Sequence, residues 1–183
     1  MSEEKTTEEI IKDLVARVET LEENAPEDRL AMGVMSGNYD QMMAAFIVAI
    51  GAAAFDMEVD LFFTFWAIAR LRDPKKSAKK DTLGKMFEMM LPNGAEKLPL
   101  SKMQMGGMGP AMIKHVMKIH GAKPLSQLIK EAGELGVKIY ICTMSLDLMG
   151  IKREELIDYP NMEYVGVGTF VDIFGKAKQC WFM

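Results

Sequence analysis

The sequence has few of the side chains that hold metals or form disulfide networks. Its 183 residues include two cysteines and two histidines, too few for a disulfide framework or for a zinc site built only from protein side chains. His115 and His120 are separated by about 140° around a helix and would not point together. We therefore expect no metal site, and we expect both cysteines to be reduced.

Long apolar runs are also absent. The longest run, Met42–Phe55, has 14 residues, whereas a helix that crosses a bilayer needs about 20. The chain does not open with the charged, apolar and small-residue pattern of a secretory signal peptide. These absences predict a protein without a membrane span and with a cytoplasmic location.

The sequence lacks the basic excess that is typical of nucleic-acid-binding proteins. Its formal net charge is −4. Residues 1–30 contain ten acidic and four basic residues, a net charge of −6, which leaves +2 for the rest of the chain. We therefore expect no nucleic-acid partner.

What is present is an alternation of short strand-like and longer helical segments. The predicted strands are Leu30–Met35, Val59–Trp66, Val137–Cys142, Glu163–Val167 and Gln179–Met183. The predicted helices between them are Tyr39–Phe55, residues 83–91, Leu125–Leu135 and Thr169–Lys178. This alternation predicts an α/β fold with a mostly parallel sheet of about five strands and helices on both faces.

An acidic segment at the amino terminus has a different pattern. Within Thr6–Glu23, apolar residues recur at spacings of three and four, which is typical of a helix with one apolar seam: Ile11, Leu14, Val18 and Leu21. The seam covers about two heptads, so it could pack on its own domain or against a sister subunit. We predict that residues 1–28 form a separate amphipathic helix and act as an oligomerisation arm.

A long stretch of residues 67–123 interrupts the strand–helix alternation. It begins with basic residues that form either a solvated surface or a docking patch for an acidic partner: Arg70, Arg72, Lys75, Lys76, Lys79 and Lys80. Its glycine-rich part lacks both phosphate-binding fingerprints, Gly-Lys-Ser/Thr and Gly-x-Gly-x-x-Gly. We expect no cofactor, and we predict a pocket or flap formed by Asn38 in the turn after the first strand and by Met105, Gly106, Gly107 and Met108.

Cys142 is the strongest candidate for a reactive residue. It ends a predicted buried strand, and parallel sheets bind their ligands beside the carboxyl ends of the strands. The following residues predict a short helix with Thr143 or Ser145 as its cap and Gly150 as its stop. The amino end of such a helix favours a thiolate over a thiol, which would make an accessible Cys142 nucleophilic. The alternative is an inert cysteine that packs as a small apolar side chain.

The segment Ile-Cys-Thr-Met-Ser-Leu-Asp-Leu-Met-Gly-Ile at 141–151, followed by Glu-Glu-Leu at 154–156, resembles the cysteine loop of the DsrE/DsrF-like sulfur-carrier superfamily. Ser-Gly-Asn at 36–38, Met-Gly-Gly-Met-Gly-Pro at 105–110 and Val-Gly-Val-Gly-Thr-Phe at 165–170 resemble one branch of that superfamily. The resemblance leaves the acidic helix outside and predicts a DsrE/DsrF-like domain over residues 29–183. It implies a three-layer α/β/α fold, homo-oligomers, and a persulfide on Cys142.

These observations give three functional hypotheses. The first is a sulfur carrier whose Cys142 takes sulfane sulfur from a donor protein, or from a small persulfide, and passes it to an acceptor. The second is a non-catalytic module that binds a ligand or partner and has a structural cysteine. The third is a thiol redox protein in which Cys142 pairs with Cys180, which requires their Cα atoms to lie within roughly 6 Å. Otherwise Cys180 is expected to be a core position of the last strand.

Overall fold

The computed structural model describes residues 6–78, 84, 91, 94–95 and 99–183. Its centre is a five-stranded parallel sheet with the strand order β4-β3-β2-β1-β5. The strands are β1 (Glu27–Val34), β2 (Glu58–Phe63), β3 (Lys138–Cys142), β4 (Met162–Val165) and β5 (Ala177–Phe182). The predicted five-stranded parallel sheet is therefore confirmed.

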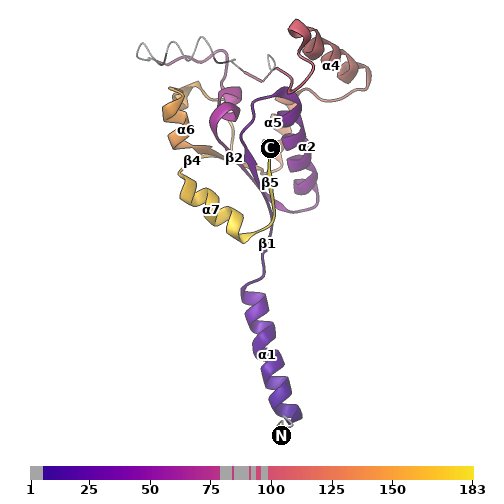
Figure 1. Ribbon diagram of the computed structural model, residues 1–183, viewed down its shortest axis with the longest axis vertical. Coiled ribbons are helices and arrows are strands. Elements are labelled where there is room, and N and C mark those ends of the chain that lie inside the picture. The colour runs from indigo at the N-terminus through magenta and orange to yellow at the C-terminus, as the bar shows by residue number, and fades with distance from the viewer. Residues whose placement is uncertain (1–5, 79–83, 85–90, 92–93, 96–98) are drawn as a thin grey trace.

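Helices lie on both faces of this sheet. The α-helices are α1 (Thr7–Glu23), α2 (Tyr39–Ala54), α4 (Met108–Ile119), α5 (Leu125–Glu134), α6 (Thr143–Leu148) and α7 (Val167–Lys176). In the part of the chain that the structure describes, three short 3-10 helices accompany them: η1 (Phe65–Leu71), η2 (Met105–Gly107) and η3 (Arg153–Glu155). Helices α2 and α5 pack together on one face, and α6 and α7 lie on the other (Figure 1). In the described part of the chain, no helix combines the length and the hydropathy that a bilayer span requires.

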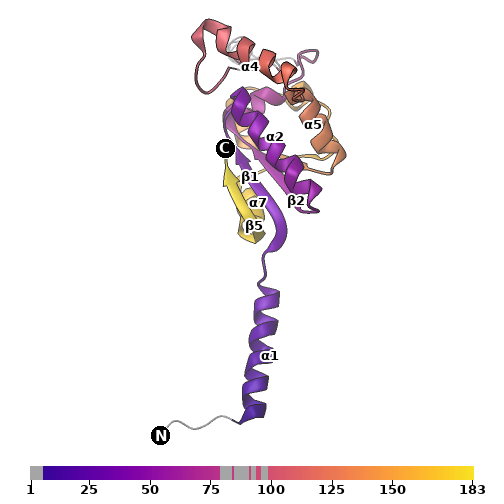
Figure 2. The ribbon, with the colours of Figure 1, turned by 90° about the vertical axis from the view of Figure 1, so that its right-hand side faces the viewer.

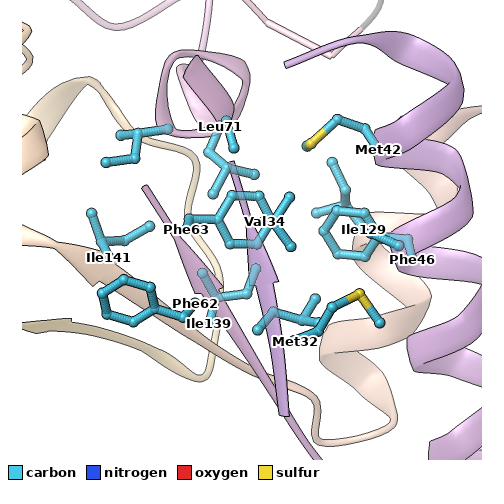
Figure 3. Packing of buried hydrophobic residues seen from close by; sticks show 14 of the residues in the cluster. Met32, Val34, Met42, Phe46, Phe62, Phe63, Leu71, Ile129, Ile139 and Ile141 are labelled. Carbon is cyan, nitrogen blue, oxygen red and sulfur yellow. The ribbon is translucent and has the colours of Figure 1, made fainter. Parts of the chain in front are cut away.

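The strands are apolar because both faces of the sheet are buried under helices. Successive side chains of β2 point to opposite faces, and helices cover both faces. Phe63 packs against Phe46 of α2, with ring centroids 6.1 Å apart, whereas Phe62 packs against Phe170 of α7 at 4.5 Å. Figure 3 shows part of this packing, with Phe46 of α2 beside the sheet. Burial of these side chains holds the three layers together.

One predicted strand ends earlier in the structure, and one predicted helix lies largely outside the described residues. The second strand ends at Phe63, not at Trp66, because Phe65 has a positive φ of 45° and the chain turns into η1. Trp66 lies in this 3-10 helix and is exposed. Its aromatic character is typical of a strand, but that character does not mark where a strand ends. The predicted helix at residues 83–91 falls largely outside the described residues.

Helix α1 extends away from the domain at the end opposite to α4 (Figures 1 and 2). Thr6 caps its amino end, where Glu9 completes a capping box. No side chain of α1 is buried, and the four seam residues are 50% to 70% exposed. The hypothesis that the seam packs on its own domain is therefore wrong.

The turn between β1 and α2 depends on a glycine. A Cβ atom at Gly37 would lie 2.5 Å from Nε of Arg70 and 2.7 Å from the carbonyl oxygen of Trp66. We expect Gly37→Ala to lower the free energy of unfolding by about 1–3 kcal/mol, the usual cost of overpacking. Urea unfolding measures this change.

Gly51 provides the matched control, because a Cβ atom there would have no neighbour within 4 Å. Gly51→Ala lies inside α2 and should raise the free energy of unfolding by about 0.5–1 kcal/mol. Equal effects of the two substitutions would contradict the predicted close approach of η1 to the turn.

Candidate functional site

The candidate site lies at the carboxyl edge of the sheet. Because all strands are parallel, the segments that follow them meet at this edge. Cys142 is the last residue of β3 and occupies the N-cap position of α6. Thr64, which follows β2, has its Oγ1 atom 2.7 Å from Oγ of Ser145 in α6. This hydrogen bond links two segments that are 81 residues apart in sequence.

The pairing of β3 and β4 shows which face of the sheet Cys142 occupies. Cys142 pairs with Val165, and Tyr140, two residues earlier, pairs with Phe62 of β2. Paired residues share a face, as do residues two apart along one strand. Cys142 therefore lies on the face that Phe62 shares with Phe170 of α7. Both α6 and α7 begin beside the pair of Cys142 and Val165.

Cys142 is buried. It is 3% exposed and belongs to the hydrophobic core. The expectation of an accessible thiol is therefore wrong for this conformation, in which Cys142 is buried as the alternative hypothesis proposed. The physical reason is that β3 lies inside the sheet, between β2 and β4, while helices cover both of its faces.

The residues that follow Cys142 do not cap α6 as predicted. Neither Thr143 nor Ser145 caps α6, and the cap residue, Cys142, makes no side-chain cap hydrogen bond. Instead, the Thr143 hydroxyl donates to the carbonyl oxygen of Val165 at 3.2 Å, which holds α6 against β4. Gly150 follows the helix with a φ of 61°, as the predicted stop requires.

Cys180 lies in β5 at one edge of the sheet and is exposed, so the expectation of a core position is wrong. Its thiol donates a hydrogen bond to the carbonyl oxygen of Phe174 at 3.2 Å. Strands β2 and β1 separate it from Cys142 in β3, which places the two cysteines about 14 Å apart across the sheet. Disulfides need Cα atoms within roughly 7 Å. The third hypothesis is therefore incompatible with this fold within one chain.

The predicted flap does not lie over Cys142. Met105 and Met108 are exposed, and the glycines between them form a turn with φ values of 63° and 96°. The turn leads into α4, whose Lys114 has its Nζ atom 5.5 Å from the centre of the Tyr39 ring at the start of α2. Figures 1 and 2 show α4 above α2 and α5, the layer on the opposite face from Cys142.

Asn38 lies in the turn before α2. Its Nδ2 atom donates to Oγ of Ser36 at 3.0 Å and to Oε1 of Gln41 at 2.7 Å. These contacts give Asn38 a local role in holding the turn. The structure therefore does not bring Asn38, the methionines and Cys142 together in one pocket.

In the basic stretch after β2, Arg70 and Arg72 are buried, contrary to either predicted surface role, whereas Lys75 is exposed. Arg72 is buried beside Glu155, with 3.5 Å between Nε and Oε2. Lys76 forms an ion pair of 2.7 Å with Asp158 and donates to the carbonyl oxygen of Leu156 at 3.0 Å. Lys79 and Lys80 lie outside the described residues.

The burial of Arg70 was not predicted from the sequence, which indicated a surface residue. Arg70 is 7% exposed, and its Nε and Nη1 atoms find no hydrogen-bond partner among the described residues. Burial lowers the pKa of its guanidinium to about 10. The small and apolar residues on both sides of it, Ala67–Ala69 and Leu71, could have indicated burial. A buried guanidinium with free donors at the carboxyl edge can bind an anionic group.

No three His, Cys, Asp or Glu side chains in the described segments are arranged to hold a metal ion. The side chains described above at this edge are a buried thiol, the three hydroxyls of Thr64, Thr143 and Ser145, and a guanidinium.

Comparisons with known proteins identify relatives of the chain. Residues 26–182 match the DsrE/DsrF/DrsH-like family. The chain is 49% identical over 144 residues to the uncharacterized protein YrkE of Bacillus subtilis (strain 168), covering 78% of this chain and 89% of that protein. It is 32% identical over 161 residues to the sulfur carrier protein DsrE2 of Allochromatium vinosum, covering 86% and 99%.

A solved structure is similar in fold. The crystal structure of the ychN protein from E. coli superposes with a TM-score of 0.50 at 10% identity, over 85% of this chain and 98% of that one. At this identity, the likeness concerns the fold alone.

The separation of the two cysteines gives a direct prediction. Mild oxidation of the monomer at low concentration should leave Cys142 and Cys180 unlinked, because the strands between them keep their sulfur atoms apart. Peptide mapping by mass spectrometry without reduction measures the linkage, with a chemically unfolded sample as the control that can form it. A disulfide between them in the folded monomer would contradict the strand order.

Proposed function

The chain belongs to the DsrE/DsrF/DrsH-like family, and from this premise we propose that it is a cytoplasmic sulfur carrier that holds sulfane sulfur as a persulfide on Cys142. The position of Cys142 carries the proposal. It is the last residue of an inner strand at the carboxyl edge, where parallel sheets place their reactive groups. A relative named as a sulfur carrier supports the same role.

The proposed transfer needs no cofactor and no net oxidation. The Cys142 thiolate attacks the outer sulfur of a donor persulfide, forming a new S–S bond while the donor S–S bond breaks. The donor leaves as a thiolate, and the transferred sulfur keeps its proton. An acceptor thiolate then repeats the attack on the outer sulfur of Cys142 and releases the Cys142 thiolate. The donor is a protein or a small persulfide, and the acceptor is a protein that presents a thiol.

Because Cys142 is buried, transfer requires a local opening, and α7 is the element that we propose to open. No residue of α7 is fully buried. Its main apolar anchor is Phe170, whose ring centroid lies 4.5 Å from that of Phe62 in β2 and 5.6 Å from that of Phe182 in β5. Elements with few buried contacts open at lower free energy than the core.

Arg70 adds a means of recognising the donor. Its unpaired donors lie at the carboxyl edge, where a Cβ atom at Gly37, in the turn after β1, would come within 2.5 Å of Nε. We propose that the guanidinium binds an anionic group of the incoming donor.

A second candidate function is favoured by the burial of Cys142: an oligomeric module that binds a ligand or partner, with a purely structural cysteine.

We also propose that the protein is a homo-oligomer, with residues 1–28 as an arm and residues 29–183 as the family domain. The exposed seam of α1 supports this division.

Persulfide formation is tested by incubating the reduced protein with a sulfane-sulfur donor and measuring its intact mass. We expect the mass of one sulfur atom to be added to the wild type and to Cys180→Ser, but not to Cys142→Ser. Circular dichroism confirms that the variants are folded. If the folded wild type gains no sulfur, the carrier hypothesis is wrong and the structural cysteine is favoured.

Access through α7 is tested by alkylation under native conditions. We expect Cys142 to react more slowly than the exposed Cys180. Phe170→Ala should speed the reaction of Cys142 about tenfold or more, since 1.4 kcal/mol of lost packing corresponds to a factor of ten. Mass spectrometry of each cysteine-containing peptide measures both rates.

Val171→Ala is the matched control, because Val171 lies on α7 but is exposed. It should change neither rate. If Phe170→Ala leaves the rate at Cys142 unchanged, access does not depend on opening of α7.

A further inference from the structure

Two helices expose apolar stripes that the domain does not use. In α1, the stripe consists of the seam residues Ile11, Leu14, Val18 and Leu21. In α4, a second stripe consists of Met108, Met112, Val116 and Ile119, which are 43% to 66% exposed. Met117, on another side of α4, packs against the core, so the stripe of α4 faces away from the domain. Exposed stripes of this kind mark interaction surfaces.

The two stripes match in length. The seam of α1 spans ten residue steps, or about 15 Å along the helix axis. The stripe of α4 spans eleven steps, or about 17 Å. Each presents four large apolar side chains at spacings of three or four residues, so the two can pack side by side as helix pairs do.

The helices are also opposite in charge. Between Thr7 and Glu23, α1 carries six acidic and two basic residues, a net charge of −4. Helix α4 carries two lysines and no acidic residue, and no acidic residue occurs anywhere between positions 99 and 123. Opposite charge steers association and favours one pairing over others.

The α1 and α4 of one chain do not reach each other. Helix α1 precedes β1 at the amino edge of the sheet, and α4 lies at the other end of the molecule (Figures 1 and 2). The eight residues of β1 alone span about 26 Å. The three residues Asn24–Pro26 that join α1 to β1 are too few to bring it back over this distance.

We propose that α1 of one copy docks along α4 of a second copy, apolar stripe against apolar stripe. Glu22 beside the seam and Lys118 beside the other stripe then provide the complementary charges. Each copy gives one helix and receives another, so two copies can exchange helices in a two-fold pair, or the contact can continue from copy to copy as a ring or a longer array. This proposal does not depend on a persulfide at Cys142.

Self-pairing of α1 is the main competing arrangement. β-Branched residues alternate with leucines along the seam, a pattern that favours parallel pairs. However, the seam covers only about two heptads, and self-pairing brings together two helices that each carry a charge of −4. Docking on α4 buries the same seam against opposite charge and also covers the second stripe.

Cross-linking between two variants tests the proposal. Both are full-length chains with Cys142→Ser and Cys180→Ser, one with Leu14→Cys and the other with Met112→Cys. We expect a mixture of the two to form disulfide-linked pairs at least about tenfold faster than either variant alone. Thr20→Cys, on the opposite side of α1, is the control that should not cross-link to Met112→Cys.

The other outcomes overturn the proposal. If Leu14→Cys alone cross-links fastest, α1 pairs with itself. If no combination exceeds the Thr20→Cys control, the stripes are not in contact, and binding of α4 to anionic vesicles becomes the explanation to test.

Charge reversal adds an independent measurement to the same assay. Lys118→Glu in the Met112→Cys chain should lower the cross-linking rate several-fold, and Glu22→Lys in the Leu14→Cys chain should restore it. A rate that neither reversal changes would contradict the charge complementarity on which the choice of α4 rests.

Discussion

The parallel arrangement of all five strands is the constraint on which the rest of this structure depends. A parallel strand can follow another only after the chain has crossed back over the sheet, which places helices on both faces. It also brings every strand's carboxyl end to one edge. The Thr64 and Ser145 hydroxyls meet there although 81 residues separate them. The candidate site is thus a consequence of topology and not of any local motif.

The same constraint buries the candidate nucleophile. A residue at the end of an inner strand lies beneath the helices that begin beside it. Cys142 therefore lies at the carboxyl edge of the sheet but is buried from solvent. The two helices over Cys142 differ, because α6 has the buried residues Ser145 and Leu146, whereas no residue of α7 is buried. A sulfur atom under α7 can be reached when this helix opens, whether the sulfur donor is a protein or a small persulfide.

Local sequence patterns predicted those secondary-structure elements whose apolar residues recur regularly along the chain. Apolar runs and helical periodicity were enough to place the strands and α5, because burial on both faces requires them. The exposure of Cys180 was not predictable, since its neighbours Trp181 and Phe182 are apolar and only the strand order reveals that β5 is an edge. The lysines near Arg70 likewise suggested solvent, whereas packing of η1 buries it.

The flap shows the same limit. Its glycines and methionines predicted a mobile cover, and the positive φ values of Gly106 and Gly107 agree with a tight turn. Which layer the turn joins is decided by α4 lying over the start of α2, a contact between segments far apart in the sequence. No feature of residues 105–108 themselves encodes that contact.

The two proposed activities use different sides of the molecule. Docking between copies would occupy α1 and the exposed stripe of α4, which lies on the layer of α2 and α5. Sulfur transfer would use the opposite layer, where α6 and α7 begin beside Cys142. Assembly would therefore leave α7 free to open, and a sulfur donor could approach each copy without displacing its neighbour. Because the stripes lie outside the domain core, assembly would bury apolar surface at no cost to the packing that positions Cys142.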